Sequence, residues 1–188
     1  MISRLVLQSM SKGKLSVFLL HKVPRQRDPL IPAEVDIARF EHLLDTTFTK
    51  LQVLPLGDAL ALLQAGRLPR RAACITFDDG YPDWLSGVAP LLLRRNLHAT
   101  FFITSGQFDG VPLWHERILA AVRRLPGSVL DMGIPFLPAQ PVATMADRQR
   151  QVLRLEQELK YLTLFRREQI LQQLESMAGV QPAQVPVM

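Results

Sequence analysis

The sequence predicts an α/β fold built on a parallel sheet, and two observations predict it. Short, nearly continuous apolar runs occur at residues 15–20, 73–77 and 99–104, and segments with helical periodicity separate them. Such runs are typical of parallel strands that helices cover on both faces, so we expect both faces of this sheet to be covered. The 188 residues, 48% of them hydrophobic, suffice for one sizeable core, and we expect a single domain over residues 1–188.

The first half of the chain carries the strands and the helices between them. Asp36 can cap a helix, because apolar residues follow it at three- and four-residue steps. These residues are Ile37, Phe40, Leu43, Leu44 and Phe48. An extended piece at 52–54 then leads to a compact helix at 58–65, which Gly66 ends. Residues 83–96 also favour a helix, and we expect Pro90 to kink it or to delay its start.

The second half is predicted to be helical. It contains a helix at 114–125, a proline-rich connector at 126–141, and two amphipathic helices at 146–162 and 165–177. The charges of the first amphipathic helix alternate in sign and are expected to be solvated: Arg148, Arg150, Arg154, Glu156, Glu158 and Lys160. We therefore divide the predicted domain into an α/β core at 15–106 and a helical segment at 107–188.

Composition argues against several classes of protein. The formal charge is +5 and the sequence pI is about 9.9, but the cations are scattered along the chain, so we expect no nucleic-acid partner. The single cysteine, Cys74, lies in an apolar run and is expected to be a buried thiol. No apolar stretch approaches the ~20 residues that span a bilayer. The run at 15–20 precedes His21 and Lys22 rather than a cleavage site, so we expect a soluble, cytoplasmic chain.

The most informative motif is Thr76-Phe77-Asp78-Asp79-Gly80. In parallel α/β sheets, ligands bind beyond the carboxyl ends of the strands, where these two carboxylates would emerge. Neighbouring residues that leave a strand point in different directions, so one Asp could bind a metal while the other handles a proton. An Asp-Gly turn, with one Asp capping the next helix, is the structural alternative.

A wider match extends this motif. Residues 74–81, Cys-Ile-Thr-Phe-Asp-Asp-Gly-Tyr, resemble the first catalytic motif of the polysaccharide deacetylase family, which has the NodB homology fold and is similar to carbohydrate esterase family 4. Leu20-His21-Lys22-Val23 and the segment His98-Ala99-Thr100-Phe101-Phe102-Ile103 resemble two strands of that family in the same order. The resemblance is strong over residues 15–114. Beyond 114 it is looser and is similar to the helical insertion of the exopolysaccharide-associated subgroup.

The resemblance implies a fold, an activity and site residues. The fold would be an irregular parallel (β/α) barrel, incomplete here, with a C-terminal helical insertion. The activity would be removal of N-acetyl groups from amino sugars of a polysaccharide by metal-activated water. Asp78 would be the general base, and Asp79 would bind a divalent metal, commonly zinc. His21 ends a strand on the same sheet face as Asp78, so we expect it to support the site by hydrogen bonds rather than to bind the metal.

The sequence departs from this family at the metal site. The family completes the site with a closely spaced His pair, whereas this chain has only His21, His42, His98 and His115, all far apart. We therefore expect a truncated domain that is inactive alone and binds metal only if residues outside this chain complete the site. A non-catalytic, degenerate deacetylase-like module for binding or scaffolding is the alternative. Because an incomplete barrel cannot close, we also expect self-association through open sheet edges.

Overall fold

The computed structural model describes residues 12–105 and 112–180, and these residues form two compact units. One unit holds residues 12–27 and 33–104, and the other holds residues 28–32, 105 and 112–180. We describe each unit by itself, as the α/β unit and the helical unit. In this part of the chain, no helix is both long and apolar enough to cross a membrane.

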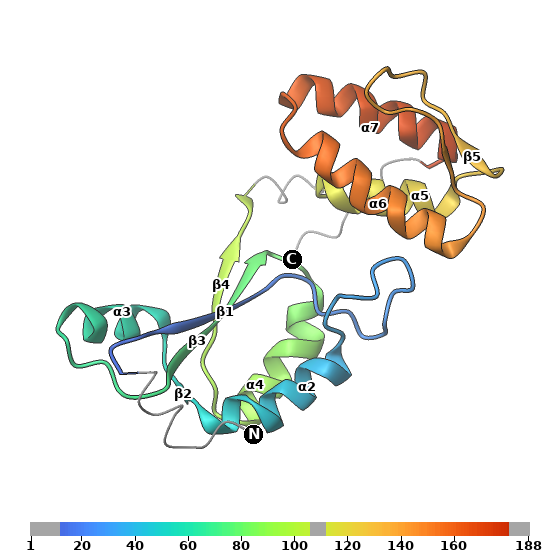
Figure 1. Cartoon of the computed structure of the whole chain (residues 1–188). Coiled ribbons are helices and arrows are strands. Elements are labelled where there is room, and N and C mark those ends of the chain that lie inside the picture. The colour runs from blue at the N-terminus through green and yellow to red at the C-terminus, as the bar shows by residue number, and fades with distance from the viewer. Residues whose placement is uncertain (1–11, 106–111, 181–188) are drawn as a thin grey trace. The chain divides into compact units, whose positions relative to one another are not determined.

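A parallel sheet forms the centre of the α/β unit (Figure 1). Its strands are β1 (Ser16–Leu20), β2 (Gln52–Val53), β3 (Ala72–Asp79) and β4 (Thr100–Ile103). Strand β3 pairs with β1 along one edge, and with β2 and then β4 along the other. The predicted α/β class and parallel sheet are therefore confirmed. β3 extends two residues beyond the predicted end at 77, so both carboxylates belong to the strand itself.

The helices of this unit follow the predicted pattern with shifted ends. They are α2 (Ile37–Thr46), a 3-10 turn (Phe48–Lys50), α3 (Leu56–Gln64), a π-helical turn (Trp84–Val88) and α4 (Ala89–Arg94). The Asp36 carboxylate accepts a hydrogen bond of 2.8 Å from the Arg39 amide, as a helix N-cap should. Pro90 lies in the first turn of α4, where its missing amide hydrogen costs nothing, so it delays the start of the α-helix.

Aromatic side chains fill one face of the sheet. The Phe77 ring stacks on Phe101 at 5.1 Å, and it also contacts Trp84 and Phe40 at 5.7 and 5.8 Å. These contacts join β3 and β4 to α2 and to the helical turn before α4, which lie on the same side of the sheet (Figure 1). Cys74 is buried in β3, as predicted, and burial raises the pKa of its thiol.

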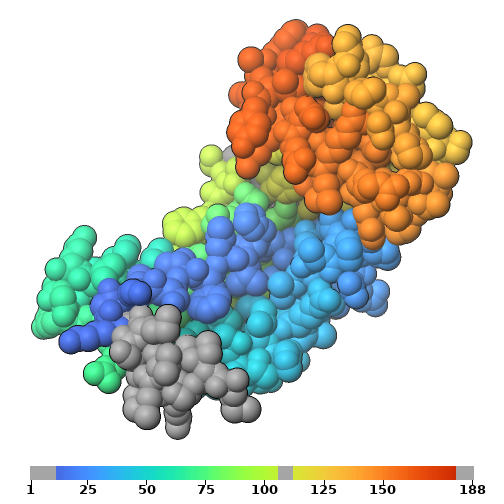
Figure 2. Space-filling view, in the orientation of Figure 1, coloured from blue at the N-terminus to red at the C-terminus, as the bar shows by residue number. Residues whose placement is uncertain are grey.

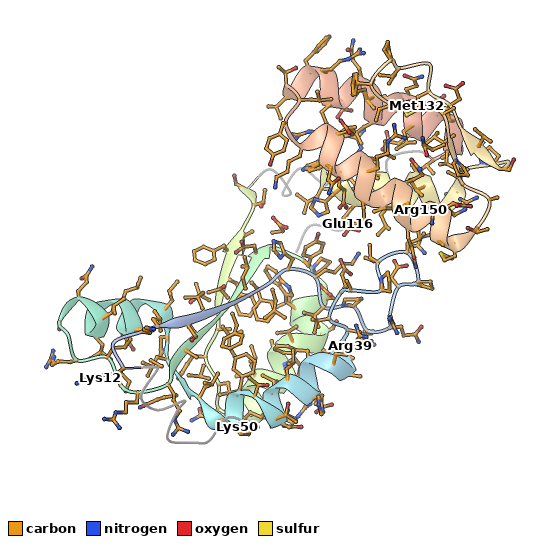
Figure 3. The ribbon with its side chains drawn as sticks, viewed as in Figure 1. Lys12, Arg39, Lys50, Glu116, Met132 and Arg150 are labelled. Atoms are coloured by element: carbon orange, nitrogen blue, oxygen red, sulfur yellow. The ribbon has the colours of Figure 1, made fainter. Side chains whose placement is uncertain are left out.

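The expectation that helices cover both sheet faces is wrong for the outer strands. Val17 and Leu19 of β1, and Phe102 of β4, are about half exposed. β1 lies at the surface of the α/β unit in the space-filling view, where it is blue (Figure 2). Labelled cations of this unit, Lys12, Arg39 and Lys50, are spread over its surface rather than gathered at one place (Figure 3).

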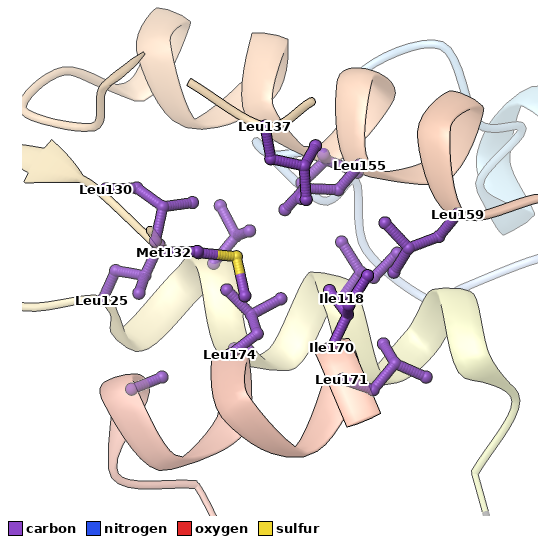
Figure 4. Close-up of a cluster of buried hydrophobic side chains, with 14 of the residues drawn as sticks. Ile118, Leu125, Leu130, Met132, Leu137, Leu155, Leu159, Ile170, Leu171 and Leu174 are labelled. Carbon is purple, nitrogen blue, oxygen red and sulfur yellow. The ribbon is translucent and has the colours of Figure 1, made fainter. Parts of the chain in front are cut away.

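The helical unit packs three helices around one core: α5 (Trp114–Arg124), α6 (Met145–Lys160) and α7 (Leu164–Ala178). Ile118, Leu155 and Leu174 point from these helices into the shared cluster (Figure 4). The predicted connector at 126–141 contains regular structure and core residues. It forms a two-stranded antiparallel hairpin of β5 (Val129–Leu130) and β6 (Gln140–Pro141), and it places Met132 in the core.

The charges of α6 are not all solvated, which corrects the expectation from their alternating signs. The Arg148 guanidinium donates to the carbonyl oxygens of Val122 and Leu125, the latter at 2.8 Å. Arg154 donates to the Pro138 carbonyl at 3.1 Å. Burial and the neighbouring Glu116 carboxylate raise the pKa of Glu156. Arg148 and Arg154 hold the C-terminal end of α5 and the connector against α6.

Candidate active site

The two carboxylates stand at the carboxyl end of β3, where β3 pairs with β4. Asp78 pairs with Phe102 and Asp79 with Ile103 in this register. Because side chains alternate along a strand, Asp78 lies on the face opposite the buried Phe77 ring and beside Phe102. The Phe77 side chain thus packs β3 into the core, and the next residue, Asp78, lies on the open face of the sheet.

The chain turns sharply after the second carboxylate. Asp79 has φ +86°, in the left-handed region, and Gly80 follows with φ +85°. Glycine adopts this conformation freely, and Asp is among the residues that tolerate it best. The positive φ therefore ends the regular strand alternation at Asp79. The Thr104 hydroxyl donates a hydrogen bond of 3.4 Å to the Asp79 carboxylate.

A hollow of about 410 Å³ lies at this place, lined by Asp78, Asp79, Phe102, Ile103 and Thr104. Both carboxylates are partly exposed in it, and Phe102 and Ile103 add an apolar wall. The sequence motifs did not point to Phe102 and Ile103 of β4, nor to Thr104 directly after it, as residues of the site. Strand order could have indicated them, because the carboxyl ends of adjacent parallel strands meet at one edge of the sheet.

The backbone of His21 lies next to this end of the sheet. It directly follows β1, whose last residue, Leu20, pairs with Phe77. Its carbonyl oxygen accepts a hydrogen bond of 2.8 Å from the Trp84 indole nitrogen, and its side chain is exposed. The Asp83 carboxylate accepts a second bond, of 2.9 Å, from the Val23 amide. These two bonds fix the segment after β1 against the turn after β3.

The other histidines have different surroundings. His42 is exposed on α2, and His98 is exposed just before β4. His115 belongs to α5 of the helical unit, where its ring contacts Trp114 at 5.7 Å. Among the described residues, no group of three or more His, Cys, Asp or Glu side chains could hold a metal ion. Asp78 and Asp79 therefore do not by themselves fit the three protein ligands of a catalytic zinc.

Comparison with known proteins decides the family of this segment. Residues 65–124 match the family model described as polysaccharide deacetylase, and this range includes β3, both carboxylates and β4. Residues 65–124 are thus similar to part of a polysaccharide deacetylase domain. The predicted family is thus confirmed for this partial domain.

Two further comparisons concern curated proteins and solved structures. No curated protein matches the chain significantly. Among solved structures, the chain is similar to a de-N-acetylase from Aggregatibacter actinomycetemcomitans, with 17% identity and a TM-score of 0.38. That match covers 77% of this chain and 51% of the other, so the chain spans about half the length of that deacetylase.

Proposed function

We propose that this chain supplies the carboxylate part of a polysaccharide N-deacetylase site, with Asp78 as the general base and Asp79 as one ligand of a divalent metal. The observation that carries the proposal is the placement of two adjacent carboxylates in one hollow, only the second of them at positive φ, within the segment that matches the deacetylase family. An acetylated amino-sugar polysaccharide is the proposed substrate class. The remaining metal ligands would come from residues other than those described.

The proposed role of Asp78 is proton transfer. In N-acetyl hydrolysis, a water oxygen bonds to the acetyl carbon, the C–N bond breaks, and the departing nitrogen takes a proton. A partly exposed carboxylate beside an apolar wall can accept the proton of that water and later return it to the nitrogen. Phe102 and Ile103 line the same hollow and could contact the acetyl methyl group or a sugar face.

The Thr104 hydroxyl supports a separate role for Asp79. Its hydrogen bond restrains one oxygen of the Asp79 carboxylate and leaves the other available to a cation. Asp78 has no corresponding restraint from β4, because Phe102 is its partner in the register. This difference supports the division into a base and a ligand.

A nuclear magnetic resonance titration tests the proposal without requiring turnover. An N-acetylated amino-sugar tetramer is added to the ¹⁵N-labelled chain, and the same tetramer with free amines is the comparison. We expect shifts centred on residues 78–79 and 102–104, with the acetylated tetramer binding more tightly. Asp78→Asn should weaken binding of the acetylated tetramer by roughly tenfold, the value of one charge-assisted hydrogen bond.

The matched control is Asp58→Asn, which removes the same charge from an exposed position on α3. It should leave the affinity unchanged. Shifts that fall elsewhere, or equal effects of the two substitutions, would overturn the proposed site. Equal binding of both tetramers would favour the non-catalytic binding module instead.

A further inference from the structure

The turn between α6 and α7 exposes three large apolar side chains within five residues. Tyr161 is 85% exposed, Leu164 is 76% exposed and Phe165 is 75% exposed. We call these three residues the α6–α7 tip. The turn and β5 lie at opposite ends of the helical unit (Figure 1). Single exposed apolar residues are common, but a cluster of this kind marks a contact surface.

The tip is built into the fold rather than loosely attached. Leu162 packs against the core, and its amide donates to the Leu159 carbonyl at 3.3 Å. The Thr163 hydroxyl caps α7 by accepting a bond of 3.3 Å from the Arg166 amide. Ile170, Leu171 and Leu174 supply the buried face of α7. The two tip residues in the first turn of α7 are therefore held outward, and ordering them on contact costs little.

The charges within residues 160–167 have one sign. Residues 160–167 include Lys160, Arg166 and Arg167 and no acidic residue. The Lys160 ammonium lies 5.7 Å from the centre of the Tyr161 ring. The carboxylate of the next residue, Glu168, forms an ion pair of 2.6 Å with Arg117. Exposed Lys160 and Arg166 therefore complement an anionic surface.

A membrane surface fits this combination better than a protein does. A specific protein interface of standard size uses roughly 20–30 residues on each side, far more than one turn offers. Lipid interfaces, in contrast, accept a few aromatic and aliphatic side chains flanked by cations. We propose that the α6–α7 tip docks the helical unit onto an anionic phospholipid surface, with Leu164 and Phe165 entering the interface.

Vesicle co-sedimentation tests this proposal independently of any enzymatic activity. The 188-residue chain is mixed with vesicles of 70% phosphatidylcholine and 30% phosphatidylglycerol, and with vesicles of phosphatidylcholine alone. We expect binding to the anionic vesicles and weaker binding to the neutral ones. The double variant Leu164→Ser/Phe165→Ser should lower the partition coefficient by at least roughly tenfold. Arg166→Gln should lower it by about fivefold on anionic vesicles only.

The matched control is Val129→Ser/Phe136→Ser, which removes one aliphatic and one aromatic exposed side chain from the hairpin segment of the same unit. It should bind as the unchanged chain does, and circular dichroism checks that each variant is folded. Tyr161→Ser provides a second tip variant if the double variant unfolds. No binding to anionic vesicles, equal losses in tip and control variants, or tip-dependent binding to a protein but not to vesicles would overturn the proposal.

Discussion

At the scale of single residues, backbone conformation separates the two carboxylates. The sequence showed two adjacent Asp residues before Gly80, and a tight turn at the glycine could be predicted from it. That Asp79 itself has a positive φ could not, because Asp also adopts extended conformations. Both Asp78 and Asp79 pair with β4, and Asp79 adopts the positive φ of the turn within that pairing. The direction of each carboxylate thus depends on a strand that lies more than twenty residues further along the chain.

Arg117 is expected to have a large effect on stability. It is 7% exposed in the helical unit and forms hydrogen bonds of 2.7 and 2.8 Å with the Glu175 carboxylate, itself 5% exposed. Arg117→Met should lower the free energy of unfolding by about 3–5 kcal/mol, because Glu175 would remain buried and unpaired. Urea unfolding measures this loss. Arg117→Met/Glu175→Gln should recover part of it, and no recovery would contradict the explanation.

The ion pair between Arg117 and Glu168 predicts a dependence of stability on pH. Hydrogen bonds from Arg117 lower the pKa of Glu168 below its ordinary value. The stabilisation is therefore complete above the unfolded-state pKa of about 4.5 and is lost as the pH falls through the lower folded-state pKa. Glu168→Gln should reduce stability near pH 7 and should lose less between pH 5 and pH 3 than the unchanged chain does. Parallel curves for the two proteins would show that this pair contributes nothing.

At the scale of elements, regular apolar periodicity allowed good predictions and irregular periodicity did not. The helices at 37–46 and 145–160 lie within a few residues of their predicted positions, because each has an apolar stripe and a capping side chain. The prolines of segment 126–141 predict a connector. Its apolar residues Leu130, Met132 and Ile134 do alternate with a period of two, a strand signal that Gly133 and Pro135 obscure.

The start of α6 illustrates how a local motif can be tested. The Thr144 hydroxyl accepts a bond of 3.1 Å from the Asp147 amide, and the Asp147 carboxylate accepts one of 2.9 Å from the Thr144 amide. Thr144→Ala should cost about 1 kcal/mol of unfolding free energy, because the Asp147 amide loses its acceptor. Thr144→Ser keeps the hydroxyl and should cost much less. Equal costs for both variants in thermal unfolding would contradict the role of the cap.

At the scale of the whole molecule, the outer strands of the parallel sheet are the feature of interest. In the part of the chain that the structure describes, β1 and β4 each pair with β3 alone, so one edge of each is unpaired. Apolar side chains on these strands are half exposed, namely Val17, Leu19, Phe102 and Ile103. Open edges with apolar side chains favour association between chains.

We therefore predict self-association through the outer strands. Sedimentation velocity at tens of micromolar should show species larger than the monomer. Leu19→Lys should shift the distribution toward the monomer, because a charge on the exposed face of an edge strand opposes pairing. Leu93→Lys, at an exposed position on α4, is the matched control and should change nothing. A monomer at every concentration, without binding of a dye for apolar surfaces, would refute this prediction.

The central proposal is that this chain holds one part of a deacetylase site and not the whole of it. The most direct test measures bound zinc and acetate release together, with an N-acetylated amino-sugar oligomer as substrate. We predict weak zinc binding that Asp79→Asn abolishes and Asp78→Asn retains, with acetate release no faster than in a zinc-only blank. One tightly bound zinc per chain, with acetate release that Asp78→Asn abolishes, would contradict the claim and show that the chain completes the site by itself.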